Sequence, residues 1–222
     1  MITIRNLTKK FNDENHLSFN DYVFEDGKTY VITGPSGCGK STLLNLIAGI
    51  ISPTTGEIHF TVNKKITPLH TLRQKAKDTF RFKNIGYVFQ DFKLVEDFTV
   101  LDNLKMLNIN GKIYTNEDFE KVLELTHITK KKNQKVKTLS GGEKQRVSIA
   151  RAIIKKSNIV LADEPTESLN ETLSHEIIQL LTSVAKSENK TLIMVTHDNS
   201  LTQYFDVCLD VKDFMKEGES NA

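Results

Sequence analysis

The chain has 222 residues, of which 38% are hydrophobic and 26% are charged, and its formal net charge is +2. Eleven glycines and four prolines exclude a collagen-like or low-complexity chain, and the composition is typical of a globular protein. A net charge this small argues against nucleic acid as a partner, and two cysteines are too few for a disulfide framework, which favours a reducing compartment.

Hydrophobic periodicity and turn residues predict an alternation of strands and helices, which favours an α/β core. The expected elements in chain order are strands at 1–5, 22–25 and 28–33, a helix at 41–50, a strand at 57–62, a helix at 69–77, a strand at 85–90, helices at 100–107, 117–126 and 142–156, a strand at 159–162, a helix at 172–186, a strand at 192–196 and an edge strand at 207–211. Residues 53–135 look mixed and are expected to be inserted into the core. The longest apolar runs are far shorter than the ~20 residues that span a bilayer, so work at a membrane would need another chain.

A phosphate-binding pattern stands between the strand at 28–33 and the helix that follows. Residues 34–41 read G-P-S-G-C-G-K-S and match G-x-x-x-x-G-K-[ST]. Glycines let backbone N–H groups surround a phosphate, and the start of the helix adds partial positive charge. Lys40 can reach the β- and γ-phosphates of a nucleotide, and the Ser41 hydroxyl can bind Mg²⁺. The expected nucleotide contacts are Gly34, Ser36, Gly37, Cys38, Gly39, Lys40, Ser41 and Thr42.

Cys38 has two interpretations. A thiol near a helix N-terminus can be reactive, because the partial positive charge there lowers its pKa. We favour the other, in which Cys38 is a small residue whose backbone faces the phosphate.

Two carboxylates follow the apolar strand at 159–162. Asp163 suits Mg²⁺, and Glu164 could accept a proton from an attacking water. Ligands of open α/β sheets bind beyond the carboxyl ends of the strands, where these residues stand. The alternative is a solvated strand end, which the phosphate loop makes less favoured.

A second glycine-rich helix start occurs at residues 139–146, which read L-S-G-G-E-K-Q-R. It could form another anion-binding helix N-terminus, or Ser140 could be only an N-cap. Neither interpretation is favoured by this segment alone.

Taken in order, the phosphate loop, Gln90, L-S-G-G-E-K-Q-R, I-V-L-A-D-E-P-T at 159–166, and His197 after an apolar strand resemble the ATP-binding-cassette (ABC) ATPases over nearly the whole chain. Residues 85–91 and 162–166 are most similar to the branch of lipoprotein-releasing and macrolide- or peptide-exporting systems, which also holds a cell-division ATPase. The resemblance implies one domain over 1–222. Its P-loop NTPase core would have a mostly parallel sheet, an antiparallel N-terminal β part, and a helical subdomain at about 91–157.

The same resemblance implies roles for single residues. Phe11 would stack on adenine, with an ordinary core aromatic as the alternative. Gln90 would touch Mg²⁺ or water and sense a membrane subunit, with a solvated strand end as the alternative. Glu164 would be the general base and His197 would contact the γ-phosphate.

Cofactors and partners are also implied. The expected cofactors are ATP and Mg²⁺, and the expected metal ligands are Ser41, Gln90 and Asp163. Ser140, Gly141 and Gly142 would contact ATP bound by an opposite subunit, in a homo- or heterodimer.

The expected function is ATP hydrolysis that powers a separate transmembrane permease at the cytoplasmic face of the membrane, for export of peptide, lipoprotein or drug-like cargo. One alternative is a non-transport ABC ATPase that signals through a membrane partner, and another is a nucleotide switch without turnover. A DNA-repair ABC ATPase is disfavoured because the chain has no room for a long coiled-coil insertion, and a P-loop kinase would leave the later motifs unexplained.

Two features bear on this function. Asn170 stands where the family usually has aspartate, which puts communication between two ATP sites in doubt. The lysines at positions 130, 131, 132, 135 and 137 could attract an anionic bilayer, although a solvated loop is the favoured interpretation.

Overall fold

The computed structural model describes residues 1–12, 16–62, 64–108 and 113–215, whose strands form two five-stranded sheets. The strands are β1 (Ile2–Lys10), β2 (His16–Ser18), β3 (Tyr22–Phe24), β4 (Thr29–Thr33), β5 (Thr55–Val62), β6 (Lys65–Pro68), β7 (Ile85–Val88), β8 (Ile159–Asp163), β9 (Thr191–Thr196) and β10 (Val207–Asp210). The α-helices are α1 (Lys40–Ile47), α2 (Gln74–Asn84), α3 (Val100–Lys105), α4 (Asn116–Leu125), α5 (Gly141–Ile153), α6 (Glu171–Ser187) and α7 (Val211–Phe214). Short 3-10 turns lie at Leu69–Thr71, Met106–Asn108, Thr129–Lys131, Val136–Thr138 and Asn199–Tyr204.

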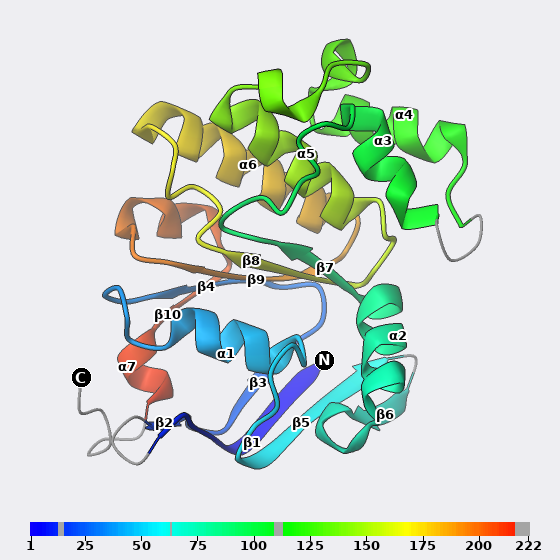
Figure 1. Ribbon diagram of the computed structural model, residues 1–222. Coiled ribbons are helices and arrows are strands. Elements are labelled where there is room, and N and C mark those ends of the chain that lie inside the picture. The colour runs from blue at the N-terminus through cyan, green and yellow to red at the C-terminus, as the bar shows by residue number, and fades with distance from the viewer. Residues whose placement is uncertain (13–15, 63, 109–112, 216–222) are drawn as a thin grey trace.

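The central sheet is parallel, in the order β10-β4-β9-β8-β7. Every residue of β8 and β9 is buried, because helices α3 to α6 cover one face of the sheet and α1 lies against the other (Figure 1). This arrangement confirms the predicted α/β class, and β10 is an edge strand as expected.

The parallel sheet separates two hydrophobic cores. Val160 and Ala162 belong to the core under the helical layer, whereas Ile159 and Leu161 belong to the core shared with α1 and the second sheet. This division follows from the strand itself, since successive side chains of a strand point to opposite faces.

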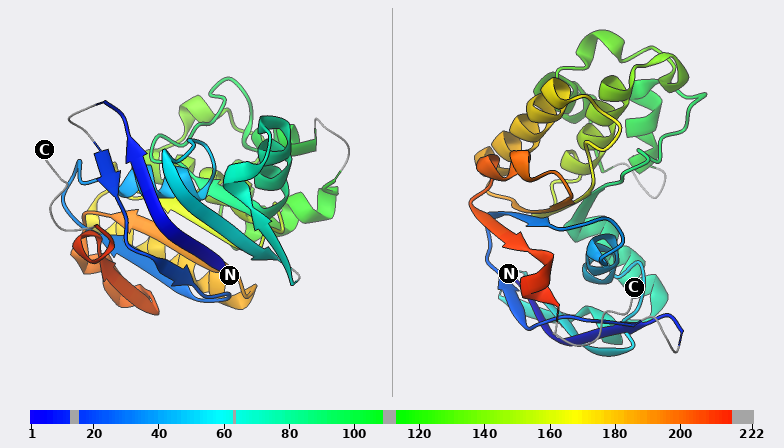
Figure 2. Two further views of the ribbon diagram at one scale, coloured as in Figure 1. Left: turned by 90° about the horizontal axis from the view of Figure 1, so that it is seen from below. Right: turned by 90° about the vertical axis from the view of Figure 1, so that its left-hand side faces the viewer.

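The second sheet is antiparallel, in the order β2-β1-β5-β6, with β3 also paired to β1. Ile2 and Ile4 of β1 stand opposite Phe60 and Ile58 of β5, and all four are buried on one face. The molecule is therefore elongated, with the helical layer at one end and the antiparallel sheet at the other (Figure 2). The expected antiparallel N-terminal part is confirmed.

Some boundaries differ from the sequence-based expectations. The helix expected at 69–77 is wrong in its bounds: Leu69–Thr71 is a 3-10 turn, Leu72 and Arg73 are extended, and α2 begins only at Gln74. The short strands β2 and β6 were not expected.

The helical subdomain expected at 91–157 corresponds to α3, α4 and α5. These helices share one hydrophobic core with α6, which lies outside that range, so the division stays a prediction. Among the described residues, no helix is both long enough and apolar enough to cross a bilayer.

Candidate nucleotide-binding site

The phosphate loop joins the end of β4 to the start of α1. Gly37 and Gly39 have φ values of 81° and 97°, in a backbone region that residues other than glycine rarely adopt. A Cβ at Gly39 would lie 2.8 Å from Leu17 Cδ1, and one at Gly34 would lie 2.4 Å from Val211 Cγ1. Besides leaving the backbone open to a phosphate, these glycines therefore let β2 and α7 pack against the loop.

Lys40 is 4% exposed, and its ammonium group lies back on its own loop. Its Nζ donates to the carbonyl oxygens of Gly34 (2.8 Å) and Pro35 (2.9 Å) and lies 3.5 Å from Glu164 Oε1. The Cys38 Sγ is 3.9 Å from the same nitrogen. A buried ammonium needs acceptors, and the loop carbonyls and Glu164 supply them at the position where a phosphate would compete for this group.

Ser41, in the first turn of α1, is hydrogen-bonded to Asp163, the first of the two carboxylates that follow the strand at 159–162. Ser41 Oγ donates to Asp163 Oδ1 at 2.7 Å, and the Tyr87 hydroxyl lies 3.5 Å from Asp163 Oδ2 and 3.1 Å from Asn45 Oδ1. Burial and the neighbouring Glu164 raise the pKa of Asp163, although the Ser41 hydrogen bond opposes this shift. Burial and the Asp163 charge also raise the pKa of Tyr87. A hydroxyl and a carboxylate in contact are the hard oxygen donors that Mg²⁺ prefers, so Ser41 and Asp163 fit this ion.

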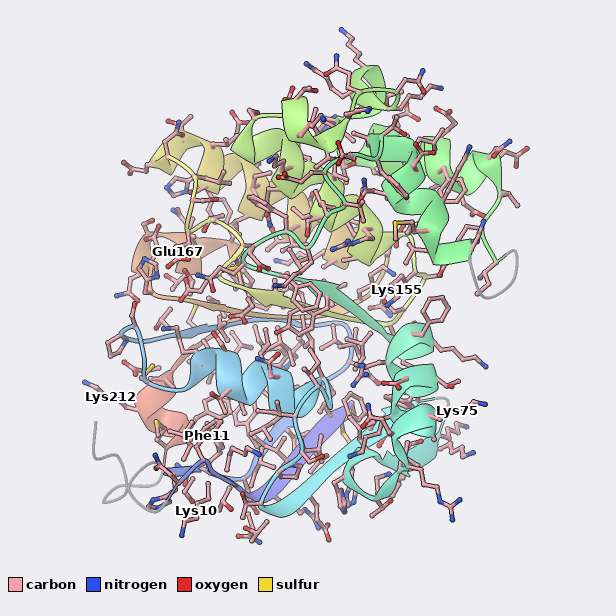
Figure 3. The ribbon with its side chains drawn as sticks, viewed as in Figure 1. Lys10, Phe11, Lys75, Lys155, Glu167 and Lys212 are labelled. Carbon is pink, nitrogen blue, oxygen red and sulfur yellow. The ribbon has the colours of Figure 1, made fainter. Side chains whose placement is uncertain are left out.

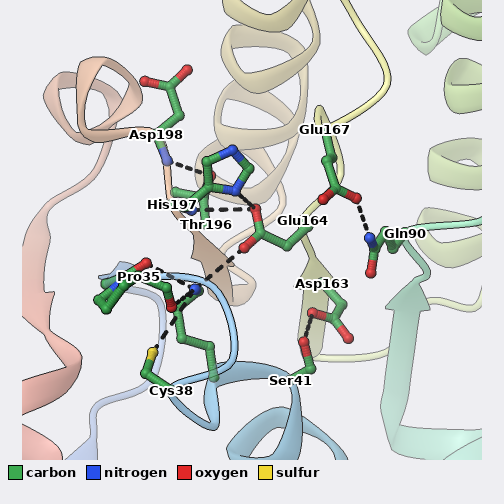
Figure 4. Close-up of polar contacts among 12 residues, drawn as sticks. Pro35, Cys38, Ser41, Gln90, Asp163, Glu164, Glu167, Thr196, His197 and Asp198 are labelled. Atoms are coloured by element: carbon green, nitrogen blue, oxygen red, sulfur yellow. Dashed lines mark hydrogen bonds and ion pairs between the residues drawn. The ribbon is translucent and has the colours of Figure 1, made fainter.

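Glu164 is 8% exposed and lies between the phosphate loop and His197 (Figure 4). Its Oε2 accepts from the His197 backbone N–H at 3.2 Å and is 2.9 Å from His197 Nδ1, while Oε1 faces Lys40. The φ of Glu164 is 42°, a left-handed conformation that costs a non-glycine residue about 1–2 kcal/mol. Consecutive strand residues would normally face opposite ways, but here Asp163 and Glu164 both contact the phosphate loop.

Gln90 follows β7 and lies at the edge of this group. Its amide donates to the Glu167 carboxylate, which comes from the segment between β8 and α6 (Figure 4). Of the three expected metal ligands, the structure thus brings Ser41 and Asp163 into contact. The third, Gln90, is paired with Glu167.

The glycine-rich start of α5 is a capping box. Ser140 Oγ accepts from the Glu143 backbone N–H at 3.4 Å, and Glu143 Oε2 accepts from the Ser140 backbone N–H at 2.9 Å. Ser140 and Gly141 are exposed, while a Cβ at Gly142 would lie 2.3 Å from Leu173 Cδ2. Ser140 is therefore an N-cap in this chain, and its exposure is also compatible with an anion-binding helix N-terminus.

Phe11 comes directly after β1, at the rim of the antiparallel sheet (Figure 3). Its side chain is 58% exposed, and the Lys9 ammonium lies 5.6 Å from the centre of its ring. This exposure excludes the core-aromatic alternative.

Asn170 is the N-cap of α6, where its Oδ1 accepts from the Leu173 backbone N–H at 3.0 Å. Asparagine caps helices as well as aspartate does, so the local structure tolerates the exchange. A pocket of about 400 Å³ is lined by its chain neighbours Leu169 and Glu171 and by His197, among other residues.

Three of the five lysines in the cluster at 130–137 lie against acidic side chains. Lys131, Lys132 and Lys137 pair with Glu143, Glu120 and Asp97 at 3.2, 2.7 and 2.8 Å. These pairs support the solvated-surface interpretation.

Sequence reasoning assigned no role to Tyr87, although it contacts Asp163. Its only signal was its place in the strand that precedes Gln90. The phosphate loop, the start of α1 and the acidic end of β8 converge at the carboxyl edge of a parallel sheet. They define a P-loop nucleoside triphosphate-binding protein.

Comparison with known proteins makes this class specific. The family described as "ABC transporter" matches residues 17–167. The lipoprotein-releasing system ATP-binding protein LolD of Treponema denticola is 36% identical over 214 residues, which are 93% of this chain and 93% of that protein. LolD of Bacteroides fragilis is 34% identical over 96% of this chain and 98% of its own length.

Among solved structures, a dimeric ATP-binding cassette in a post-hydrolysis state with bound ADP and phosphate has a TM-score of 0.82 and 31% identity, covering 100% of this chain and 97% of that one. The chain belongs to the ABC transporter family. It is an ATP-binding subunit of the kind that hydrolyses ATP.

Proposed function

We propose that this ATPase powers the release or export of a lipoprotein, peptide or drug-like cargo through a separate membrane permease, at the cytoplasmic face of the membrane. The observation that carries the proposal is the similarity to two lipoprotein-releasing ATP-binding proteins along almost the full length of all three chains.

The contacts among the site residues support a division of roles. Ser41 and Asp163 would hold Mg²⁺, with Gln90 joining them, and the ion would neutralise charge on the β- and γ-phosphates. Lys40 would exchange its loop carbonyls for phosphate oxygens. Glu164 would accept the proton of the attacking water.

Other residues would complete the ATP site. His197 would hold Glu164 in place through the 2.9 Å contact and would contact the γ-phosphate. Phe11 would stack on the adenine, and its exposure supports this role. The exposed start of α5, with Ser140 and Gly141, would contact ATP held by a second ATPase subunit.

The permease would dock on the segment that follows Gln90. Val95, Phe98 and Met106 are 37%, 44% and 37% exposed, and they bring apolar side chains to the surface between the Gln90 segment and the end of α3. Exposed apolar groups of this kind are typical of a surface that a partner covers.

Reconstitution tests the proposal. The chain is co-expressed with a candidate multi-span permease of the lipoprotein-releasing type, and the complex is placed in vesicles with a fluorescent acylated peptide. We expect ATP-dependent transfer of the peptide to an acceptor, and loss of transfer with Glu164→Gln. ATP hydrolysis without transfer, together with activation of a cell-wall enzyme by the same membrane partner, would instead support the signalling alternative.

A further inference from the structure

The loop that carries Gln90 has an unusual backbone. Phe92 and Lys93, two residues with long side chains, have φ values of 60° and 49° in succession. Left-handed conformations are unfavourable for such residues and persist only when surrounding contacts hold them. The loop makes its own hydrogen bonds, from the Phe92 N–H to the Phe89 carbonyl oxygen (3.2 Å) and from the Lys93 N–H to the Asp91 carbonyl oxygen (2.6 Å). A contact from outside residues 89–93 adds to them.

Arg151, in the last turn of α5, supplies that contact. Its Nη2 donates to the Phe92 carbonyl oxygen at 2.6 Å, and its Nη1 donates to the Lys93 carbonyl oxygen at 2.5 Å. The guanidinium is planar and carries donors in a fixed fork, so it binds the two carbonyls of the left-handed residues together. The side chain is half-buried, which strengthens hydrogen bonds of this kind.

The same helix end also holds the beginning of β7. Lys155, just past α5, donates to the Ile85 carbonyl oxygen at 3.0 Å and lies beside the upper end of α2 (Figure 3). A Cβ at Gly86 would lie 2.4 Å from the Ala152 carbonyl oxygen, so helix and strand are in close contact there. The beginning of β7 and the Gln90 loop are thus both attached to the C-terminal end of α5, and Ser140 is the N-cap at the other end of this helix.

We propose that Arg151 is a positioning residue for ATP hydrolysis, which holds the left-handed loop so that Gln90 stays at the edge of the Ser41–Asp163 pair. Arg151 itself does not touch the nucleotide. The inference rests on the role proposed above for Gln90.

Hydrogen exchange of the nucleotide-free protein tests the structural part. Arg151→Met removes both hydrogen bonds and keeps most of the side-chain volume. We expect the amides of residues 89–94 to exchange roughly tenfold faster or more, because each lost bond is charge-assisted. Arg146→Met is the matched control, since Arg146 lies on the same helix and pairs instead with Glu176 on α6, at 3.1 Å. Unchanged exchange at 89–94, or equal acceleration by the control, would overturn the proposal.

Steady-state kinetics test the catalytic part. We expect Arg151→Met to lower kcat about tenfold, with the Kd for Mg-ATP unchanged within about twofold, because the phosphate loop is intact. In a Gln90→Ala background the same substitution should lower kcat no further, since both act through one loop. Additive losses in the double variant would overturn the proposal, as would a fall in kcat that only follows a fall in melting temperature.

Two features of the design keep the outcomes distinct. If Arg151→Met does not fold, Arg151→Lys carries the same test, since lysine keeps the charge and can make one of the two bonds. Wild type and Arg146→Met run in the same assay show whether the chain hydrolyses ATP at all. The proposed site can therefore fail separately from the role of Arg151.

Discussion

Replacing Glu164 with glutamine separates its contact with Lys40 from its two contacts with His197. The carboxylate lies 3.5 Å from the Lys40 ammonium and also accepts two contacts from His197. Glutamine has a similar shape but only one acceptor oxygen. That oxygen can serve the His197 backbone N–H, which leaves an uncharged amide facing Lys40.

The expected magnitudes follow from these distances. Unit charges 3.5 Å apart attract by about 5 kcal/mol at an effective dielectric constant of about 20, and desolvation of the buried pair offsets most of this. We take the net Lys40–Glu164 attraction to be about 1.4 kcal/mol, which ATP must overcome when its phosphate replaces Glu164 beside Lys40. Without this attraction the variant should bind ATP about tenfold more tightly. Loss of a general base lowers turnover by about 10²–10⁴-fold. Tight binding without turnover should also accumulate an ATP-bound dimer.

Three measurements check this prediction: phosphate release, titration with a fluorescent ATP analogue, and size-exclusion chromatography with ATP. Glu124→Gln, which changes an exposed carboxylate on α4, is the control for charge removal. Undiminished phosphate release would rule out Glu164 as the base. Unchanged or weaker ATP affinity would show that its contact with Lys40 does not compete with phosphate.

The remaining predictions concern packing and protonation. Gly86→Ala should lower the free energy of unfolding by about 1–3 kcal/mol, because the new methyl group meets a backbone carbonyl, and Gly141→Ala, whose Cβ has ordinary contacts, should change it far less in the same urea titration. Asp163→Asn should stabilise the nucleotide-free protein at pH 7 while abolishing turnover, because burial in the folded state raises the pKa of this carboxyl and so disfavours its charge. Burial and two nearby arginines lower the pKa of Lys155 to about 8 from 10.5, so the wild type should gain stability relative to Lys155→Met as the pH rises from 8 to 10.5.

The protonation predictions have defined signs. The folded state keeps a proton on Asp163 to higher pH than the unfolded chain, so the advantage of Asp163→Asn must vanish below about pH 4, where both states are protonated. For Lys155, the unfolded chain binds more protons between pH 8 and 10.5, which makes unfolding less favourable as the pH rises. An advantage of Asp163→Asn that persists in acid, or a stability difference at Lys155 that stays flat between pH 8 and 10.5, would contradict the assigned environments.

Local patterns carried most of what could be predicted. The phosphate loop and the acidic end of β8 lie within short stretches whose residue types follow directly from phosphate and metal chemistry. The parallel sheet followed from fully apolar runs such as 159–162. Neither prediction requires knowledge of distant contacts, which explains why both survive in the structure.

What the sequence did not reveal depends on segments far apart in the chain. Nothing near Arg151 in the sequence indicates that it binds the carbonyl of Phe92, and nothing near Gly34 indicates that Val211 approaches it. The start of α2 was predicted five residues too early for a related reason. Leu69 is buried in the core as part of a 3-10 turn, and a buried leucine at this spacing gives the same hydrophobic pattern as the first turn of an α-helix.

The division of the interior by β8 and β9 has a practical consequence for protein engineering. Truncation of Val160 and truncation of Leu161 would create cavities on opposite faces of the parallel sheet, although the residues are adjacent in the chain. Truncations beneath the helices and beside α1 that lie more than about 10 Å apart should add without coupling, because the sheet keeps their side-chain partners separate. A stabilising change in one core can therefore be combined with a stabilising change in the other.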